Sequence, residues 1–217
     1  MSSLLAPTFL FRFSTPCRHA PDIFEANPGP LSEQYRLPCF GELDERRTYA
    51  DVRVGWNASG VGVYLKVEGK QQSPWCRDNK IEDSDGLQLW IDTRDTKSVH
   101  RANRFCHRFA VLPLGSGRNL DQPTIGLLAI NRARESPREI HERSLVVRSK
   151  RLPTGYELEA FFPAAALTGY DPAEHPKLGF NYVVLDRELG PQTFTVGTEF
   201  PIAEDPSLWG TLELVRD

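Results

Sequence analysis

Hydrophobic and polar residues alternate along most of the chain, which is the pattern of β-strands that bury one face. The clearest case is a pair of runs, 50–56 and 61–67, in which every second residue is hydrophobic. The turn sequence Asn57-Ala58-Ser59-Gly60 separates the two runs. Two alternating runs joined by such a turn predict a β-hairpin.

Further alternating runs follow at the spacing of a β-sandwich. They cover residues 87–91, 104–112, 124–131, 144–151, 155–162, 178–186, 192–196 and 208–215. A helical turn is predicted only at 163–167, where Pro163 suits a first helical position. So many strands with almost no helix exclude a parallel α/β fold. We predict a single all-β domain over residues 1–217, a two-sheet antiparallel β-sandwich of the jelly-roll type, with a closed barrel as the alternative.

The first 48 residues follow a different pattern. Phe9, Phe11 and Phe13 alternate with other residues and predict one short strand. Residues 16–48 then contain five prolines, at positions 16, 21, 28, 30 and 38. Proline cannot donate to the hydrogen bonds of a central strand. We therefore expect an irregular, proline-rich N-terminal segment that lies over the core.

Composition and charge narrow the range of partners. The 217 residues carry a net charge of −3 and no long basic run, so a nucleic-acid partner is not expected. No apolar stretch approaches the roughly 18 residues that a membrane span needs. The N-terminus lacks the pattern of a signal peptide, so a cytoplasmic location is the default expectation. The sequence does not indicate an oligomeric state.

The residue types that perform catalysis are present, but their spacing does not favour an active site. Cys106 and His107 are neighbours in an expected strand, so they point to opposite faces. Glu157 and Glu159 share one face and cannot easily lie on both sides of a glycosidic bond. No G-x-S-x-G motif occurs, and the four cysteines form no C-x-x-C pair, although a Cys17–Cys39 disulfide is left open. We expect no enzymatic activity.

An acidic loop precedes the strand at 87–91. Glu82, Asp83 and Asp85 place three carboxylates within four positions. Carboxylate oxygens are the ligands that calcium prefers, so these residues form a candidate calcium site. The alternative is that Asp85-Gly86 simply forms a turn that opens the strand.

One tryptophan lies in a polar loop rather than in an alternating run. Trp75 follows Pro74 and is surrounded by polar residues from Gln71 to Asp78. An exposed indole offers a flat apolar face on which a sugar ring can stack. The alternative is that Trp75 anchors its loop to the edge of the sandwich.

At this point the order of motifs resembles that of family 9 carbohydrate-binding modules. The motifs are ADVRVGW (50–56), GVYLKV (62–67), Pro74-Trp75, DGLQLWIDTRD (85–95), RFAVLPLG (108–115), GYELEAFFP (155–163), LGFNYVVLD (178–186) and EDPSLWGTLEL (204–214). Each motif is short, and their shared order over residues 49–215 carries the resemblance. It implies a jelly-roll sandwich that binds sugars, commonly between two aromatic rings.

The resemblance also implies a set of ligand-binding residues. Trp75 matches the first ring, Arg108 matches a ligand-binding arginine, and Gln88 stands where the family usually has glutamate. The second tryptophan, expected shortly before DPSLWG, is absent, and Phe200 is the aromatic candidate in that stretch. Asp85 completes the candidate set. Haem, which related sandwiches bind with a methionine-type ligand, is not expected because the only methionine is Met1.

The sequence therefore predicts non-catalytic binding of a mono- or oligosaccharide. The alternative function is that of an interaction or scaffold domain that keeps the sandwich and has lost the sugar site.

Overall fold

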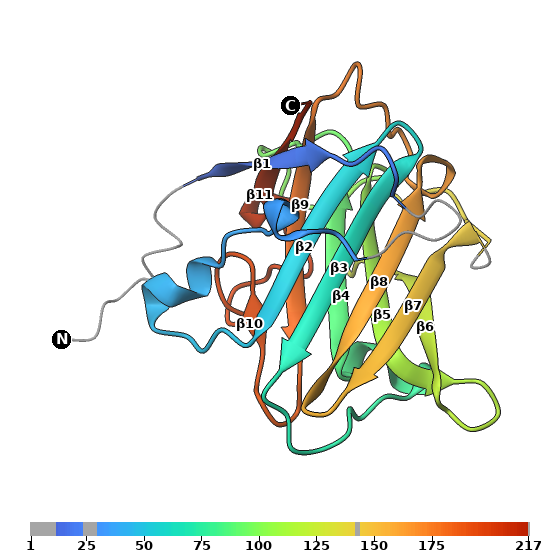
Figure 1. The fold of residues 1–217 in the computed structure, drawn as a ribbon. Coiled ribbons are helices and arrows are strands. Elements are labelled where there is room, and N and C mark those ends of the chain that lie inside the picture. Colours follow the sequence, from blue (N-terminus) through green and yellow to red (C-terminus); the bar gives the residue numbers. More distant parts are fainter. Residues whose placement is uncertain (1–11, 24–29, 142–143, 217) are drawn as a thin grey trace.

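The computed structural model describes residues 12–23, 30–141 and 144–216, and this part of the chain is built from β-strands (Figure 1). The strands are β1 (Ser14–His19), β2 (Ala50–Asn57), β3 (Gly60–Glu68), β4 (Gly86–Asp92), β5 (Cys106–Ser116), β6 (Gln122–Leu128), β7 (Val146–Leu152), β8 (Gly155–Pro163), β9 (Lys177–Leu185), β10 (Gln192–Thr193) and β11 (Gly210–Val215). Short 3₁₀ turns occur at Glu33–Tyr35, Phe40–Asp44, Asp78–Asp83, Ala164–Ala166 and Pro206–Leu208. The described residues contain no α-helix. The predicted all-β class is confirmed, and a helical turn follows Pro163 as predicted. The expectation that it is the only helical turn is wrong, because 3₁₀ turns also form at the other four positions.

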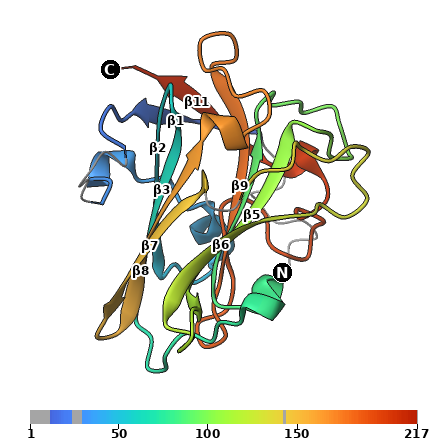
Figure 2. The same ribbon diagram turned by 90° about the vertical axis from the view of Figure 1, so that its right-hand side faces the viewer.

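The strands form two facing layers that are joined into one sheet. The strand order is β6-β5-β4-β9-β11-β1-β2-β3-β8-β7, with β10 paired to β9. Figure 2 shows the layer of β2, β3, β8 and β7 facing the layer of β9, β5 and β6. Strand β1 pairs in parallel with both β11 and β2, so it connects the two layers. The prediction of two separate, purely antiparallel sheets is corrected on this point, because the bridging strand makes the sheet continuous and mixed.

Strand β1 also corrects the interpretation of the N-terminal segment. Pro16 lies inside β1, opposite Glu213 of β11. Pairing with β2 starts only at Arg18, so just one edge of β1 is paired at Pro16 and a proline is tolerated there. Of the strand predicted around Phe9–Phe13, Phe9 and Phe11 lie outside the described residues. Phe13 precedes β1, and its ring centroid lies 4.1 Å from that of Phe40.

Residues 20–23 and 31–35 of the N-terminal segment lie over the outer face of β2 and β3. A Cβ atom added to Gly62 of β3 would lie 2.5 Å from Cγ2 of Ile23. A Cβ atom on Gly55 of β2 would lie 3.0 Å from Cβ of Ala20. These two glycines therefore allow the segment to approach the sheet closely.

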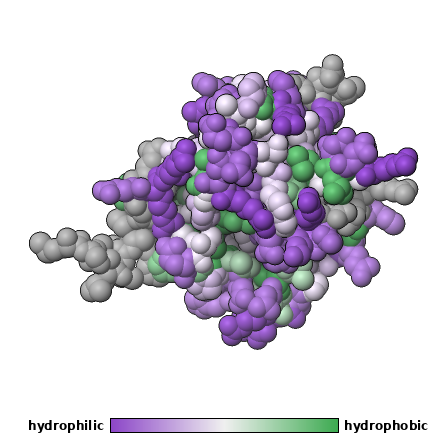
Figure 3. All heavy atoms as spheres, turned by 90° about the horizontal axis from the view of Figure 1, so that it is seen from below, coloured by the Kyte–Doolittle hydropathy of each residue, from purple (hydrophilic) through white to green (hydrophobic). Residues whose placement is uncertain are grey.

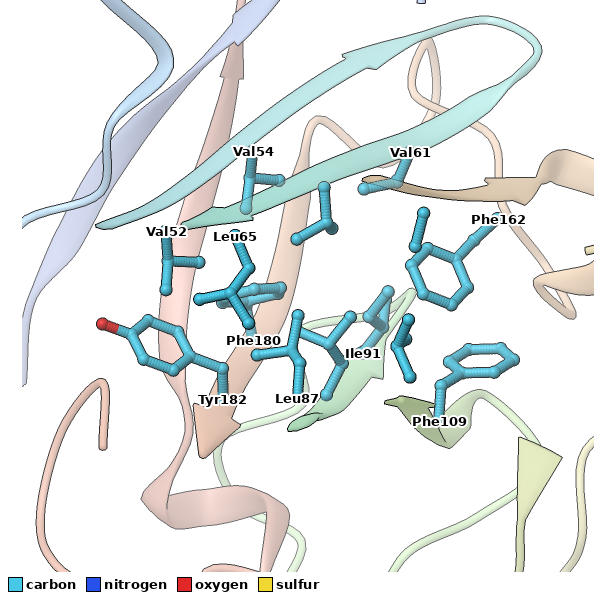
Figure 4. Packing of buried hydrophobic residues seen from close by; sticks show 14 of the residues in the cluster. Val52, Val54, Val61, Leu65, Leu87, Ile91, Phe109, Phe162, Phe180 and Tyr182 are labelled. Carbon is cyan, nitrogen blue, oxygen red and sulfur yellow. The ribbon is translucent and has the colours of Figure 1, made fainter. Parts of the chain in front are cut away.

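The main core fills the space between the two layers (Figure 4). Alternate residues of each strand point inward, as the period-two pattern predicted. Val52, Val54, Val61, Leu65 and Phe162 of one layer meet Leu87, Ile91, Phe109, Phe180 and Tyr182 of the other. Full burial of each such side chain stabilises the fold by about 1.5–3 kcal/mol.

A second apolar cluster covers the outer face of β4, β5 and β9. It contains Trp90, Cys106 and Val183 from these strands, packed against residues of the loops, among them Ile130, Ile202 and Trp209. Every residue of β4 is consequently buried. The four cysteines are free, so the Cys17–Cys39 disulfide is not formed. No helix in the described ranges is long and apolar enough to cross a membrane.

Candidate functional site

Three of the residues singled out from the sequence meet on the outer face of β4 and β5. Arg108 of β5 donates hydrogen bonds from Nη2 to Oε1 of Gln88 at 2.8 Å and to Oε2 of Glu82 at 3.2 Å. Gln88 in turn donates from Nε2 to the backbone oxygen of Glu82 at 2.9 Å. Alternation along antiparallel strands places Gln88 and Arg108 on the same face. The predicted grouping of Gln88 and Arg108 is thus present, and Glu82 joins it through its exposed carboxylate.

The same face holds a row of polar side chains that the sequence analysis did not assign to the site. In register across the sheet, Arg108 lies opposite Trp90, and Trp90 lies opposite Asn181 of β9. Nε of Arg108, Nε1 of Trp90 and both amide atoms of Asn181 are buried without a hydrogen-bond partner among the described residues. Trp90 and Asn181 are 2% and 0% exposed, so this row is polar but closed to solvent. The alternation of 87–91 places Trp90 on this face, but the position of Asn181 depends on strand pairing.

Trp75 lies beside the start of β4, where Asp85 holds its loop. Oδ2 of Asp85 accepts a hydrogen bond from the Trp75 backbone N–H at 3.0 Å. Oδ1 of Asp85 accepts one from the backbone N–H of Arg187 at 2.9 Å. The Arg187 guanidinium then stacks on the Trp75 ring, with Cζ 3.3 Å from the ring centroid. Figure 3 shows this end of the molecule, where hydrophilic residues cover most of the surface.

Asp85 is therefore a structural residue, which corrects its assignment to the ligand-binding set. Its side chain is 2% exposed and lies 3.3 Å from the ammonium of Lys70. Lys70 also pairs with the fully buried carboxylate of Asp186. Because a buried carboxylate needs a cation and hydrogen-bond donors, Asp85 is fully used inside the protein.

The carboxylates proposed as calcium ligands do not converge. Glu82 pairs with Arg108, Asp83 is exposed, and Asp85 is buried against Lys70. Within the described ranges, no three His, Cys, Asp or Glu side chains form a group that could hold a metal ion. The predicted ligand set of Glu82, Asp83 and Asp85 is thus not assembled, because a lysine takes the place of the cation at Asp85.

Phe200 lies in a different place from Trp75 and Arg108. It packs against the outer apolar cluster and lines a cavity of about 730 Å³. Phe13, Trp209 and Thr195 line the same cavity, and neither Trp75 nor Arg108 does. Phe200 therefore does not form a second ring opposite Trp75.

The side chains near this cavity do not form a catalytic triad. Nδ1 of His100 lies 3.1 Å from Oδ2 of Asp205 and also 3.1 Å from Oγ of Ser207. A triad needs the serine and the carboxylate on different nitrogens of the imidazole, whereas both contact the same nitrogen here. Cys106 and His107 point to opposite faces, as predicted, since Cys106 lies in the outer cluster and His107 stacks near Phe109 of the core. Burial raises the pKa of the Cys106 thiol to about 12, so it is not a thiolate nucleophile.

Comparisons with known proteins bear on the fold. No family model matches the sequence, and no curated protein matches it. A solved structure of a family 9 carbohydrate-binding module from Caldicellulosiruptor kristjanssonii, in complex with cellotriose, is similar with a TM-score of 0.60 and 14% identity, over 94% of this chain and 95% of that one. A family 9 module from the same organism, in complex with glucose, is similar with a TM-score of 0.59 and 15% identity, over 95% and 97% of the two chains. The chain thus has the fold of family 9 modules along almost its whole length.

Proposed function

We propose that this protein binds carbohydrate without catalysing a reaction, and that its two layers form a jelly roll bridged by β1. The proposed ligand is a mono- or oligosaccharide. Two observations support the proposal. The order of sequence motifs resembles that of family 9 modules, and solved modules with this fold hold cellotriose and glucose.

We locate the site at the hydrogen-bonded group of Arg108, Gln88 and Glu82 on the outer face. A sugar hydroxyl both donates and accepts hydrogen bonds. Arg108 supplies donors in a fixed plane, Gln88 supplies an amide, and Glu82 supplies an exposed acceptor. The side chains hold one another in place, so little side-chain freedom is lost when a ligand binds.

The expected affinity is low. Arg108 and Gln88 are only 9% and 7% exposed, and the proposed site offers a sugar one ring, that of Trp75. A few hydrogen bonds and one ring give dissociation constants of roughly micromolar to millimolar, or about −8 to −4 kcal/mol.

Titration calorimetry with glucose, cellobiose, cellotriose and xylose tests the proposal. We expect saturable binding by the wild type that Trp75→Ala and Arg108→Ala both abolish. Because Arg108 is largely buried, Glu82→Gln provides a milder variant that should weaken binding with folding intact. Arg118→Ala, at an exposed turn after β5, is the control that should bind as the wild type does. If all the site variants keep saturable binding, the sugar binds at a different place on the protein.

The alternative, an interaction domain that has lost its sugar site, is favoured by one contact. Arg187 covers a face of the Trp75 ring at 3.3 Å, where a neutral sugar would otherwise stack. The absence of binding to every sugar offered, by a folded wild-type protein, would favour this alternative.

A further inference from the structure

The exposed guanidinium of Arg187 lies against the aromatic ring of Trp75. The guanidinium of Arg187 lies 3.3 Å from the ring centroid, and that of Arg77 lies 5.5 Å from it. Both arginines are exposed, whereas the ring is half-buried. A guanidinium stacked flat on a ring keeps its N–H groups in the stacking plane, pointing outward.

The chain fixes both members of this pair at their backbones. The single carboxylate of Asp85 accepts the N–H of Trp75 and the N–H of Arg187. Asp85 is itself held by the buried ammonium of Lys70. The backbones of both residues are therefore fixed before any ligand arrives, and the ring contact limits the freedom of the guanidinium, which lowers the entropic cost of binding.

The nearby carboxylates are already engaged with other groups. Asp186 pairs with Lys70, and Glu82 pairs with Arg108. Glu188 accepts hydrogen bonds from the backbone N–H groups of Gln72 and Gln71, which hold the pKa of its carboxyl below the usual value. Among the side chains that the structure describes, no carboxylate lies within 4.0 Å of the guanidinium of Arg77 or Arg187. The two cations flanking Trp75 thus lack an anionic partner within the described part of the protein.

We infer that the sugar bound at this site carries a carboxylate, as a uronic acid does. This inference rests on the proposed function and names the class of its ligand. The carboxylate lies in the plane of the Arg187 guanidinium and accepts two parallel hydrogen bonds, a pairing that arginine favours over lysine. On the face that Arg187 covers, the ring of Trp75 backs the arginine instead of stacking on a sugar.

The hydroxyl-binding groups belong to the strand that begins beside Asp85. Gln88 is two residues beyond Gly86, where β4 begins, and this spacing corresponds to about 7 Å along the strand. In this proposal, a sugar whose carboxylate lies at Arg187 directs its hydroxyls toward Gln88 and Arg108. Arg187 sets the preference for the charged sugar, and the group on the outer face binds the hydroxyls.

The test compares matched pairs of sugars by titration calorimetry. Glucuronic acid is compared with glucose, and galacturonic acid with galactose, at low ionic strength. We expect the wild type to bind the acid of one pair about tenfold more tightly than its neutral partner, because a paired guanidinium and carboxylate add a charge-assisted contact. Arg187→Gln should remove this preference, so that the acid and the neutral sugar of the pair bind with similar affinity. Arg187→Lys should restore only part of it, since an ammonium lacks the planar fork.

Arg104→Gln is the matched control, because Arg104 is also an exposed arginine against an aromatic ring, 5.1 Å from the centroid of Phe105. It should keep the preference for the acid. Equal affinity for the acid and the neutral sugar would overturn the inference and leave the proposed function standing. Equal loss of the preference in Arg104→Gln and Arg187→Gln would also overturn it, since the effect would then be general charge attraction. Binding of acetate as tight as that of glucuronic acid, with no binding of any neutral sugar, would instead overturn the proposed function.

Discussion

The ammonium of Lys70 lies 3.3 Å from the carboxylate of Asp85, and both side chains are only 2% exposed. Asp186, whose side chain is fully buried, binds the same ammonium. Two buried carboxylates therefore share one buried cation. These carboxylates accept the backbone N–H groups of residues 75 and 187–189, so the ion pair ties the Trp75 loop to the end of β9.

Removing the cation should destabilise the fold strongly. Lys70→Met leaves Asp85 and Asp186 buried and without a counter-charge, and breaking a buried pair in this way costs about 3–5 kcal/mol. Urea denaturation measures the free energy of unfolding. Lys66→Met is the control, because Lys66 pairs with Glu68 at the surface, where such pairs contribute at most about 1 kcal/mol. Equal losses in the two variants would contradict the structural role given to Lys70.

His107 should make stability depend on pH. Burial lowers the pKa of its imidazole to about 4, and Nε2 accepts a hydrogen bond from the backbone N–H of Thr168 at 2.8 Å. As the pH falls below about 6.5, the unfolded chain takes up a proton that the folded chain does not. Stability should therefore fall between pH 6.5 and about 4, by up to about 3 kcal/mol, and this contribution should level off below that range.

Urea titrations at pH 7.5 and pH 4.5 check this expectation. His107→Gln keeps an acceptor for Thr168 but cannot be protonated, so its stability should change less between the two pH values. His141→Gln, at an exposed position, should behave as the wild type does. An unchanged pH dependence in His107→Gln would show that other groups cause the loss.

Calcium should not stabilise the protein. Glu82, Asp83 and Asp85 do not converge, and Lys70 already neutralises Asp85. Ligand binding to the folded state raises the melting temperature by mass action. Melting curves in excess chelator and in millimolar calcium should therefore coincide. A higher melting temperature in calcium would restore the acidic loop as a metal site.

Local patterns predicted most of the strands but not their partners. The alternation of 50–67 is set by which residues face the core, so the hairpin of β2 and β3 follows from the sequence itself. Strand β1 contains Pro16, and it forms because β11, almost 200 residues later, offers an edge. Pairing over such a distance leaves no trace in a local pattern.

In the candidate site, too, local patterns predicted some residues and missed those that distant parts of the chain supply. Gln88 and Arg108 could be assigned to one face because β4 and β5 alternate regularly. Asp85 resembled a metal ligand in the sequence, since nothing local shows that Lys70 reaches it. Asn181 and Arg187 come from the region of β9, and their positions beside Trp90 and Trp75 depend on the pairing of β9 with β4.

The central claim is that a sugar binds at Trp75 and the group of Arg108, Gln88 and Glu82. The Arg108 guanidinium lies 5.5 Å from the ring centroid of the buried Trp90, so Trp90 reports on this group. The indole N–H signals in nitrogen-15 NMR spectra test the claim directly, because the chain has four tryptophans. Nε1 of Trp56 is bonded to the backbone oxygen of Cys17 at 2.8 Å, and Nε1 of Trp209 to that of Ile202 at 2.7 Å. Substitution of each tryptophan by phenylalanine assigns the signals.

During titration with glucose, cellotriose and glucuronic acid, the signals of Trp75 and Trp90 should shift together and saturate with at least one of these sugars. The signals of Trp56 and Trp209 should stay in place. Saturable shifts of Trp209 alone would place the ligand in the cavity beside Phe200. Constant Trp75 and Trp90 signals at millimolar concentrations of every sugar would contradict the claim.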